Sequence, residues 1–70
     1  MTAGEKLRSL REDRGMSVDD LAKTLGLTRQ AVYNYEMDAR VPRDEIKVQI
    51  ANFFGVGIEE IFFTQRATIR

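Results

Sequence analysis

The stretch that decides the fold is residues 17–36, SVDDLAKTLGLTRQAVYNYE. Ser17 and Asp20 have the spacing of a shortened capping box, in which the serine hydroxyl satisfies an early backbone N–H of a helix. Gly26 ends this helix at a position where a residue with positive φ is wanted. Thr28 begins another helix two residues later, again as an N-cap. A short helix, a turn with glycine and a second helix have the spacing of a helix-turn-helix, which many helical hairpins share.

The second helix of this pair has an unusual polar face. At about 100° per residue, Ala31, Val32 and Tyr35 fall on one side and face the core. The other side carries no carboxylate, and its residues are Arg29, Gln30, Tyr33, Asn34 and Met37. Arginine can bind guanine O6 and N7, and glutamine or asparagine can pair with adenine N6 and N7. We therefore predict base contacts in the major groove from Arg29, Gln30, Tyr33 and Asn34. The alternative is a solvated polar face without a ligand.

The remaining sequence predicts three more short helices and no strand. The first spans residues 2–14 and ends at Gly15, as glycine commonly does just past a helix. Another starts with Asp44 as its cap, and the last spans residues 58–63. The fold is therefore expected to be all-α with five helices. Outside the helix with the polar face, its expected core residues are Leu7, Leu10, Leu21, Ala22, Leu25, Ile46, Ile50, Ala51, Phe53, Phe54, Ile61 and Phe62.

The chain's 70 residues leave room for one domain. We expect residues 1–63 to form it, with residues 64–70 as a C-terminal tail. No apolar run approaches the ~18 residues of a membrane-spanning helix, and the N-terminus lacks the apolar stretch of a signal peptide. A cytoplasmic protein without membrane contact is therefore expected.

Charge alone does not indicate a nucleic-acid ligand. Eleven basic residues balance eleven acidic ones, so the net charge is zero. A DNA-binding chain of this composition must sort its positive charges onto one face. Arg40 and Arg43 flank Pro42 just after the helix with the polar face. With Arg29 they predict a positive cluster that reaches flanking phosphates or the minor groove.

The composition argues against an enzyme. With no histidine and no cysteine, the chain lacks the commonest general base, thiolate chemistry and the usual zinc ligands. Its carboxylate pairs at residues 19–20, 44–45 and 59–60 each lie where a helix is expected to begin. Carboxylates there stabilise the positive end of the helix dipole. We therefore predict no catalytic residue, no metal and no cofactor.

Most of the chain resembles a known family. Residues 7–42, LRSLREDRGMSVDDLAKTLGLTRQAVYNYEMDARVP, followed by residues 50–62, IANFFGVGIEEIF, are similar to the phage-repressor-like (Cro/CI or xenobiotic-response-element) helix-turn-helix family. The resemblance implies a compact five-helix, lambda-repressor-like domain, usually dimeric on DNA, that regulates transcription in bacteria or their mobile elements. It also implies base reading by the four residues named above. Residues implied or expected at the DNA backbone are Ser17, Thr28, Arg40 and Arg43, and the family's structural ion pair would be Arg11 with Glu36.

The sequence departs from the family pattern near the DNA-facing side. Val18 stands where the family commonly has a glutamine that helps to clamp the DNA backbone, and Asp19 and Asp20 follow it. Residues 37–39, Met-Asp-Ala, replace a common x-Gly-Lys. These changes remove a basic residue and add carboxylates, so we expect low, strongly salt-dependent non-specific affinity.

Phenylalanines crowd the C-terminal third of the chain. Phe62 and Phe63 are consecutive and cannot both face one core. Phe63, together with Ile69 in the tail, is therefore our candidate for a homodimer interface. The alternative is that Phe63 folds back beneath the tail.

The leading functional prediction is a dimeric repressor that reads the major groove of a near-palindromic operator in double-stranded DNA. An activator that contacts RNA polymerase is a variant of the same fold. The alternative class is a protein-interaction module, such as an antitoxin or antirepressor partner, that uses the Phe-rich C-terminal surface. The zero net charge favours this module, whereas the helix face without carboxylates disfavours it.

Overall fold

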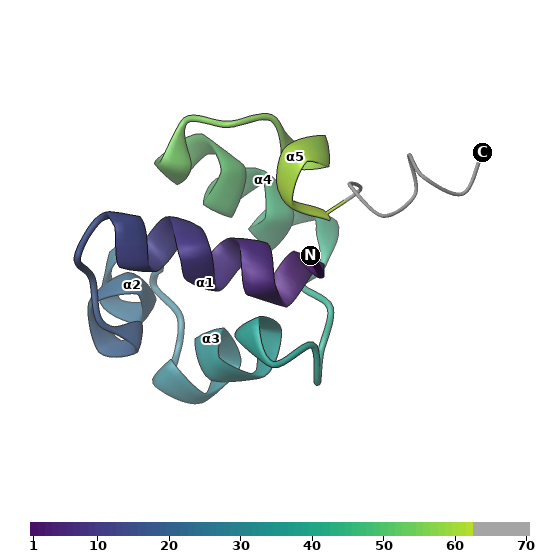
Figure 1. Cartoon of the computed structure of the whole chain (residues 1–70). Helices are drawn as coiled ribbons and strands as arrows, with labels where there is room; N and C mark the ends of the chain where they lie inside the picture. The colour runs from purple at the N-terminus through teal and green to yellow at the C-terminus, as the bar shows by residue number, and fades with distance from the viewer. Residues whose placement is uncertain (63–70) are drawn as a thin grey trace.

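The computed structural model describes residues 1–62, and this part of the chain forms α-helices and no strand (Figure 1). The helices are α1 (Ala3–Asp13), α2 (Val18–Leu25), α3 (Arg29–Glu36), α4 (Asp44–Phe54) and α5 (Ile58–Phe62). In Figure 1, α1 crosses the middle of the molecule, with α2 and α3 on one side and α4 and α5 on the other. The predicted all-α, five-helix fold is confirmed. None of these helices is long and apolar enough to cross a membrane.

Side-chain caps begin the first three helices. At α1, the Thr2 hydroxyl accepts from the Glu5 N–H at 3.1 Å, and the Glu5 carboxylate accepts from the Thr2 N–H at 2.8 Å. At α2, Ser17 and Asp20 form the same reciprocal pair, with both distances 3.0 Å. At α3, the Thr28 hydroxyl accepts from the Ala31 N–H at 3.1 Å. These bonds satisfy N–H groups that have no partner within their helix, and the predicted caps Ser17 and Thr28 are confirmed.

The predicted cap of α4 is wrong by one residue. Arg43 is the N-cap and makes no side-chain cap hydrogen bond, and Asp44 is the first helical residue. Asp44 and Glu45 therefore lie in the first turn of α4. There they stabilise the helix through its dipole and not through a direct cap.

The turn between α2 and α3 depends on Gly26. Its backbone has φ 71° and ψ 30°, the left-handed conformation that costs glycine little. The Leu27 N–H then donates to the Ala22 carbonyl at 2.8 Å, which satisfies a carbonyl at the end of α2. The chain can therefore start α3 at once, and this turn fixes the angle between the two helices of the motif.

All five helices contribute to one core. Its fully buried larger side chains are Leu7, Leu21, Val32, Ile50 and Ile61. Ala22, Leu25, Ala51 and Phe54 complete the buried cluster. Among the predicted core residues, Leu10, Tyr35, Ile46, Phe53 and Phe62 are only partly buried and pack against its edge. A domain this small has too little interior to enclose every apolar side chain.

A buried ion pair joins α1 to the end of α3. Arg11 Nε donates to Glu36 Oε2 at 2.7 Å, and Arg11 Nη2 donates to Glu36 Oε1 at 3.2 Å. The residues are 9% and 7% exposed. Arg11 Nη1 also donates to the carbonyl of Met16 at 2.6 Å, in the loop before α2. The hydrogen bond to Glu36 is the main reason why the pKa of Arg11 is raised. The pair that the family resemblance implied is thus present, and one guanidinium holds three segments together.

A second connection fixes the start of α1 to the loop after α3. Asp38 Oδ2 accepts from the Thr2 hydroxyl at 2.6 Å, and Asp38 Oδ1 accepts from the Gly4 N–H at 2.9 Å. Asp38 does this from a left-handed backbone conformation, with φ 60°. Gly4 lies so close to α3 that a side chain there would overlap the Glu36 carbonyl oxygen. The sequence pattern did not predict this connection.

We expect Arg11→Ala to lower the free energy of unfolding by about 3–5 kcal/mol, because it leaves the buried Glu36 charge without a partner. The double variant Arg11→Met, Glu36→Leu removes both charges and should lose much less. Urea unfolding followed by circular dichroism measures both. Wild-type stability of the single variant would show that the pair is not a structural brace.

We expect Asp38→Ala to destabilise the domain more than Asp38→Gly, by about 1 kcal/mol. Both variants lose the two hydrogen bonds to α1, but alanine also retains the strain of a positive φ, which glycine relieves. The same urea titration tests this order. Asp13→Ala, which removes an exposed carboxylate at the end of α1, is the control. Equal losses for the alanine and glycine variants would exclude strain at this position.

Candidate nucleic-acid interface

The outward face of α3 carries no negative charge. Glu36 is the only carboxylate in this helix, and it is buried in the pair with Arg11. Arg29 and Gln30 are exposed, Tyr33 is half-exposed at 50%, and Asn34 is partly buried. The structure therefore places all four predicted base-reading residues on one helix, with its single acid turned inward.

Two of these residues are joined by a hydrogen bond. Gln30 Nε2 donates to Asn34 Oδ1 at 3.1 Å across one helical turn. This bond leaves the side-chain oxygen of Gln30 and the side-chain N–H groups of Asn34 as the outer polar groups of the pair. An acceptor and a donor side by side are what an adenine edge requires, since it offers N6–H₂ and N7 in the major groove.

The start of α2 carries two carboxylates with different partners. Asp20 is part of the capping box. Its pKa is lowered mainly by the hydrogen bond from the Ser17 backbone N–H, and to a smaller extent by a hydrogen bond with the Ser17 side chain. Asp19 lies between two exposed cations: Asp19 Oδ2 is 3.6 Å from Lys23 Nζ, and Asp19 Oδ1 is 4.0 Å from Arg29 Nε. The contact with Lys23 follows the i, i+4 spacing. The contact with Arg29 joins two helices, so no local pattern could have predicted it.

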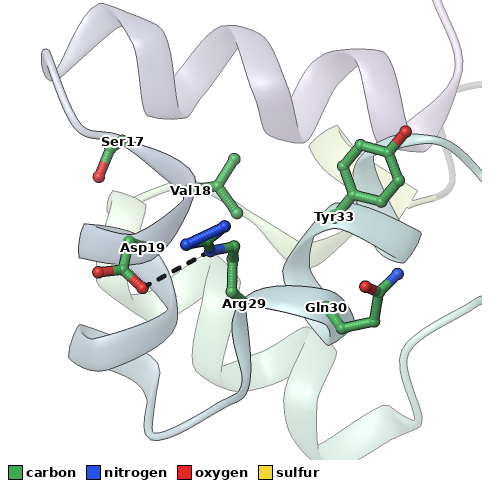
Figure 2. Close-up of a pocket in the computed structure, with 6 residues that line it drawn as sticks. All are labelled: Ser17, Val18, Asp19, Arg29, Gln30 and Tyr33. Atoms are coloured by element: carbon green, nitrogen blue, oxygen red, sulfur yellow. Dashed lines mark ion pairs between the residues drawn. The ribbon is translucent and has the colours of Figure 1, made fainter.

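A depression of about 540 Å³ lies between the start of α2 and the start of α3 (Figure 2). Its lining residues are Ser17, Val18, Asp19, Arg29, Gln30 and Tyr33. Three predicted base-reading residues and one predicted backbone-contacting residue thus share one concave surface. Val18 was singled out in the sequence only as a departure from the family pattern, and the structure makes it part of this site.

The predicted cluster of three arginines does not form as one group. Arg29 begins α3, whereas the backbone N–H of Arg40 donates to the Asn34 carbonyl near the other end, at 3.3 Å. Eight residues of helix span about 12 Å. Arg43 is exposed at the start of α4, after the buried Pro42. The cations therefore lie at the two ends of α3 and not at one point.

The remaining predicted contacts lie at two helix starts and in the C-terminal residues. Thr28 is exposed at the start of α3, where its hydroxyl caps the helix, and Ser17 is exposed at the start of α2. Phe63 and Ile69, the predicted dimer contacts, lie outside the described residues. Within residues 1–62 no group of three or more carboxylates could hold a metal ion.

Comparison with known proteins places this geometry in a family. A sequence profile described as helix-turn-helix matches residues 7–61. An HTH-type transcriptional regulator of Methanocaldococcus jannaschii is 40% identical over 57 residues, which cover 81% of this chain and 86% of the relative. An HTH-type transcriptional regulatory protein of Thermococcus kodakarensis is 35% identical over 66 residues, 94% of this chain and 21% of the relative. Another, of Pyrobaculum aerophilum, is 42% identical over 55 residues, 79% of this chain and 22% of the relative.

The chain thus spans about a fifth of the length of the last two relatives and most of the first. All three relatives are archaeal, whereas the family resemblance implied bacteria or their mobile elements. The profile match covers α2, the turn at Gly26 and α3, which are the elements that present the polar face. The chain therefore belongs to the Cro/CI-type (xenobiotic-response-element) helix-turn-helix family, a family of DNA-binding transcription regulators and not of enzymes.

Proposed function

We propose that this chain is a sequence-specific regulator that binds double-stranded DNA as a dimer and represses transcription at a near-palindromic operator. The observation that carries the proposal is the outward face of α3. Its only carboxylate is buried against Arg11, and its outward groups are the exposed guanidinium of Arg29, the exposed amide of Gln30, the half-exposed phenol of Tyr33 and the partly buried amide of Asn34. Side chains of these types read base edges in the major groove.

The proposed roles follow from the position of each side chain on α3. Arg29, at the first turn, contacts a guanine through O6 and N7. The hydrogen-bonded pair of Gln30 and Asn34 contacts an adenine, because its outer groups are one acceptor and one set of donors. Tyr33 lies on the same face, between Arg29 and this pair, and contacts a neighbouring base through its ring or hydroxyl.

Contacts to the DNA backbone hold α3 in register. The backbone residues in this proposal are Ser17, Thr28, Arg40 and Arg43. Arg40 and Arg43 lie beyond the C-terminal end of α3, and Thr28 lies at the start of α3, where N–H groups and the dipole favour a phosphate. At the start of α2, Asp19 and Asp20 offset the dipole, so Ser17 contributes through its exposed hydroxyl alone. Contacts of this kind supply affinity without sequence information.

A dimer would present two copies of α3 to successive major grooves. The centres of the two half-sites would then lie about 34–36 Å apart, which is one turn of DNA. The two-fold symmetry of the dimer requires an approximately palindromic site. Phe63 and Ile69 remain the proposed dimer contacts. Repression follows most simply if the bound dimer blocks RNA polymerase. In an activating variant, Asp19 and Asp20 are the acidic residues near enough to the DNA to contact the polymerase.

The described phenylalanines do not favour a protein-interaction module. Phe54 is buried, and Phe53 and Phe62 are partly buried. The Arg14 guanidinium carbon lies 5.0 Å from the centre of the Phe53 ring and 5.2 Å from that of Phe54, which covers part of their surface. The α3 face therefore supports a DNA ligand better than the Phe-rich region supports a protein ligand.

Selection of binding sites from a random duplex pool tests the proposed function. We expect the folded protein to enrich a palindromic sequence whose half-sites are about one helical turn apart. Fluorescence anisotropy should then show much tighter binding to this duplex than to a scrambled one at the same salt concentration. Failure of the folded protein to enrich any sequence would contradict the proposal and favour a protein partner.

Single alanine variants separate base reading from backbone binding. We expect Arg29→Ala and Gln30→Ala to relax base preference, each by about 1–3 kcal/mol of discrimination. Arg40→Ala should instead weaken all duplexes alike and reduce the slope of log K against log salt by about 0.9. Anisotropy titrations at several salt concentrations measure both effects. Unchanged selectivity in both α3 variants would exclude this face as the reader of bases.

A further inference from the structure

The depression between α2 and α3 has an apolar wall within a polar face. Val18 is partly buried, and Figure 2 shows its side chain directed toward the space between Arg29 and Tyr33. The Tyr33 ring, half-exposed, borders the same space. Val18 and the Tyr33 ring thus give the depression an apolar side that can contact an apolar group of a ligand.

Helix capping does not explain an apolar residue at this position. Ser17 and Asp20 cap α2 by themselves, through two reciprocal hydrogen bonds. Val18 packs against the edge of the core with only part of its surface. The remaining part lines the depression beside Arg29. The side chain therefore both supports α2 and shapes the surface next to the proposed base-reading residues.

Charge around the depression disfavours a phosphate as its occupant. The Asp19 carboxylate lines it, and the Asp20 carboxylate follows on the same helical turn. Both would repel a DNA phosphate at this point. Arg29 is the only cation in the lining, and its Nε already lies 4.0 Å from Asp19 Oδ1. The depression thus fits an uncharged, partly apolar group better than an anion.

We propose that this depression is a specificity site for the C5-methyl group of a thymine in the major groove, with Val18 and Tyr33 as its contacts. The inference rests on the proposed DNA-binding function. Among the four bases, only thymine presents an apolar group in the major groove, and apolar side chains select it through that methyl. Because Val18 lies on α2 and not on α3, this site adds a base contact that the recognition helix alone does not make.

Asp19 is a positioning residue in this arrangement. Its Oδ1 lies 4.0 Å from Arg29 Nε, and Figure 2 marks this ion pair beside Val18. Arg29 is thereby directed to the base next to the thymine. The site consequently reads two adjacent base pairs, one through a methyl group and one through a guanidinium.

Replacing each thymine of the selected duplex singly with deoxyuridine tests the proposal, because this removes only the methyl group. At one thymine position in each half-site, we expect the replacement to lower the protein's affinity for the duplex about fourfold, the value for burying one methyl group. In Val18→Ser the ratio between the two duplexes should fall well below fourfold, because only the Tyr33 part of the apolar contact is left. Val18→Thr, which keeps the branched shape, should give an intermediate ratio.

Val48→Ser is the matched control, since Val48 is an exposed valine on α4 that does not line the depression. It should retain the full fourfold ratio. Each ratio compares two duplexes with the same protein. If less of the Val18→Ser variant is folded, both affinities therefore fall equally and the ratio does not change. Circular dichroism verifies the fold. A selected site without any methyl-sensitive thymine, or a ratio unchanged in Val18→Ser, would overturn this site and leave the proposed function intact. Enrichment of no duplex at all would overturn both.

Discussion

The pair between Arg11 and Glu36 is the interaction on which the rest of the structure depends. It is buried and bidentate, and it joins the last turn of the chain's first helix to the end of its third. A third hydrogen bond from the same guanidinium reaches the carbonyl of Met16. Removing two charges from water is costly, and close contact with good geometry offsets that cost. The pair therefore fixes how α1, the loop before α2 and α3 lie relative to one another.

The same pair also shapes the DNA-facing surface. Because Glu36 points inward, α3 exposes no carboxylate, although the chain as a whole has as many acidic as basic residues. Acids elsewhere serve other elements: Glu5 and Asp20 cap helices, Asp38 holds the start of α1, and Asp44 lies in the first turn of α4. A protein with zero net charge can thus present a face that suits base edges, because its charges are sorted by position.

The surface next to α3 is not uniform. Its α2 border carries Val18 and Asp19, which make that end partly apolar and negative, whereas Arg40 and Arg43 lie at the opposite end of α3. In the proposed complex, the cationic phosphate contacts are therefore confined to the C-terminal end of α3. Few cations at the interface limit the general affinity for DNA, since phosphate contacts supply most of it.

The sequence by itself determined the helices, most of the core, the helix-turn-helix and the outward residues of α3. Each of these depends on short-range regularities: helical periodicity, a hydroxyl at a helix start, or a glycine at a turn. Only the tertiary structure decided that Arg29 lies beside Asp19, that Val18 lines the same depression, and that Asp38 holds α1. It also separated the arginines that the sequence had grouped. These contacts join residues on different segments, and their formation depends on how the helices pack, which local periodicity does not specify.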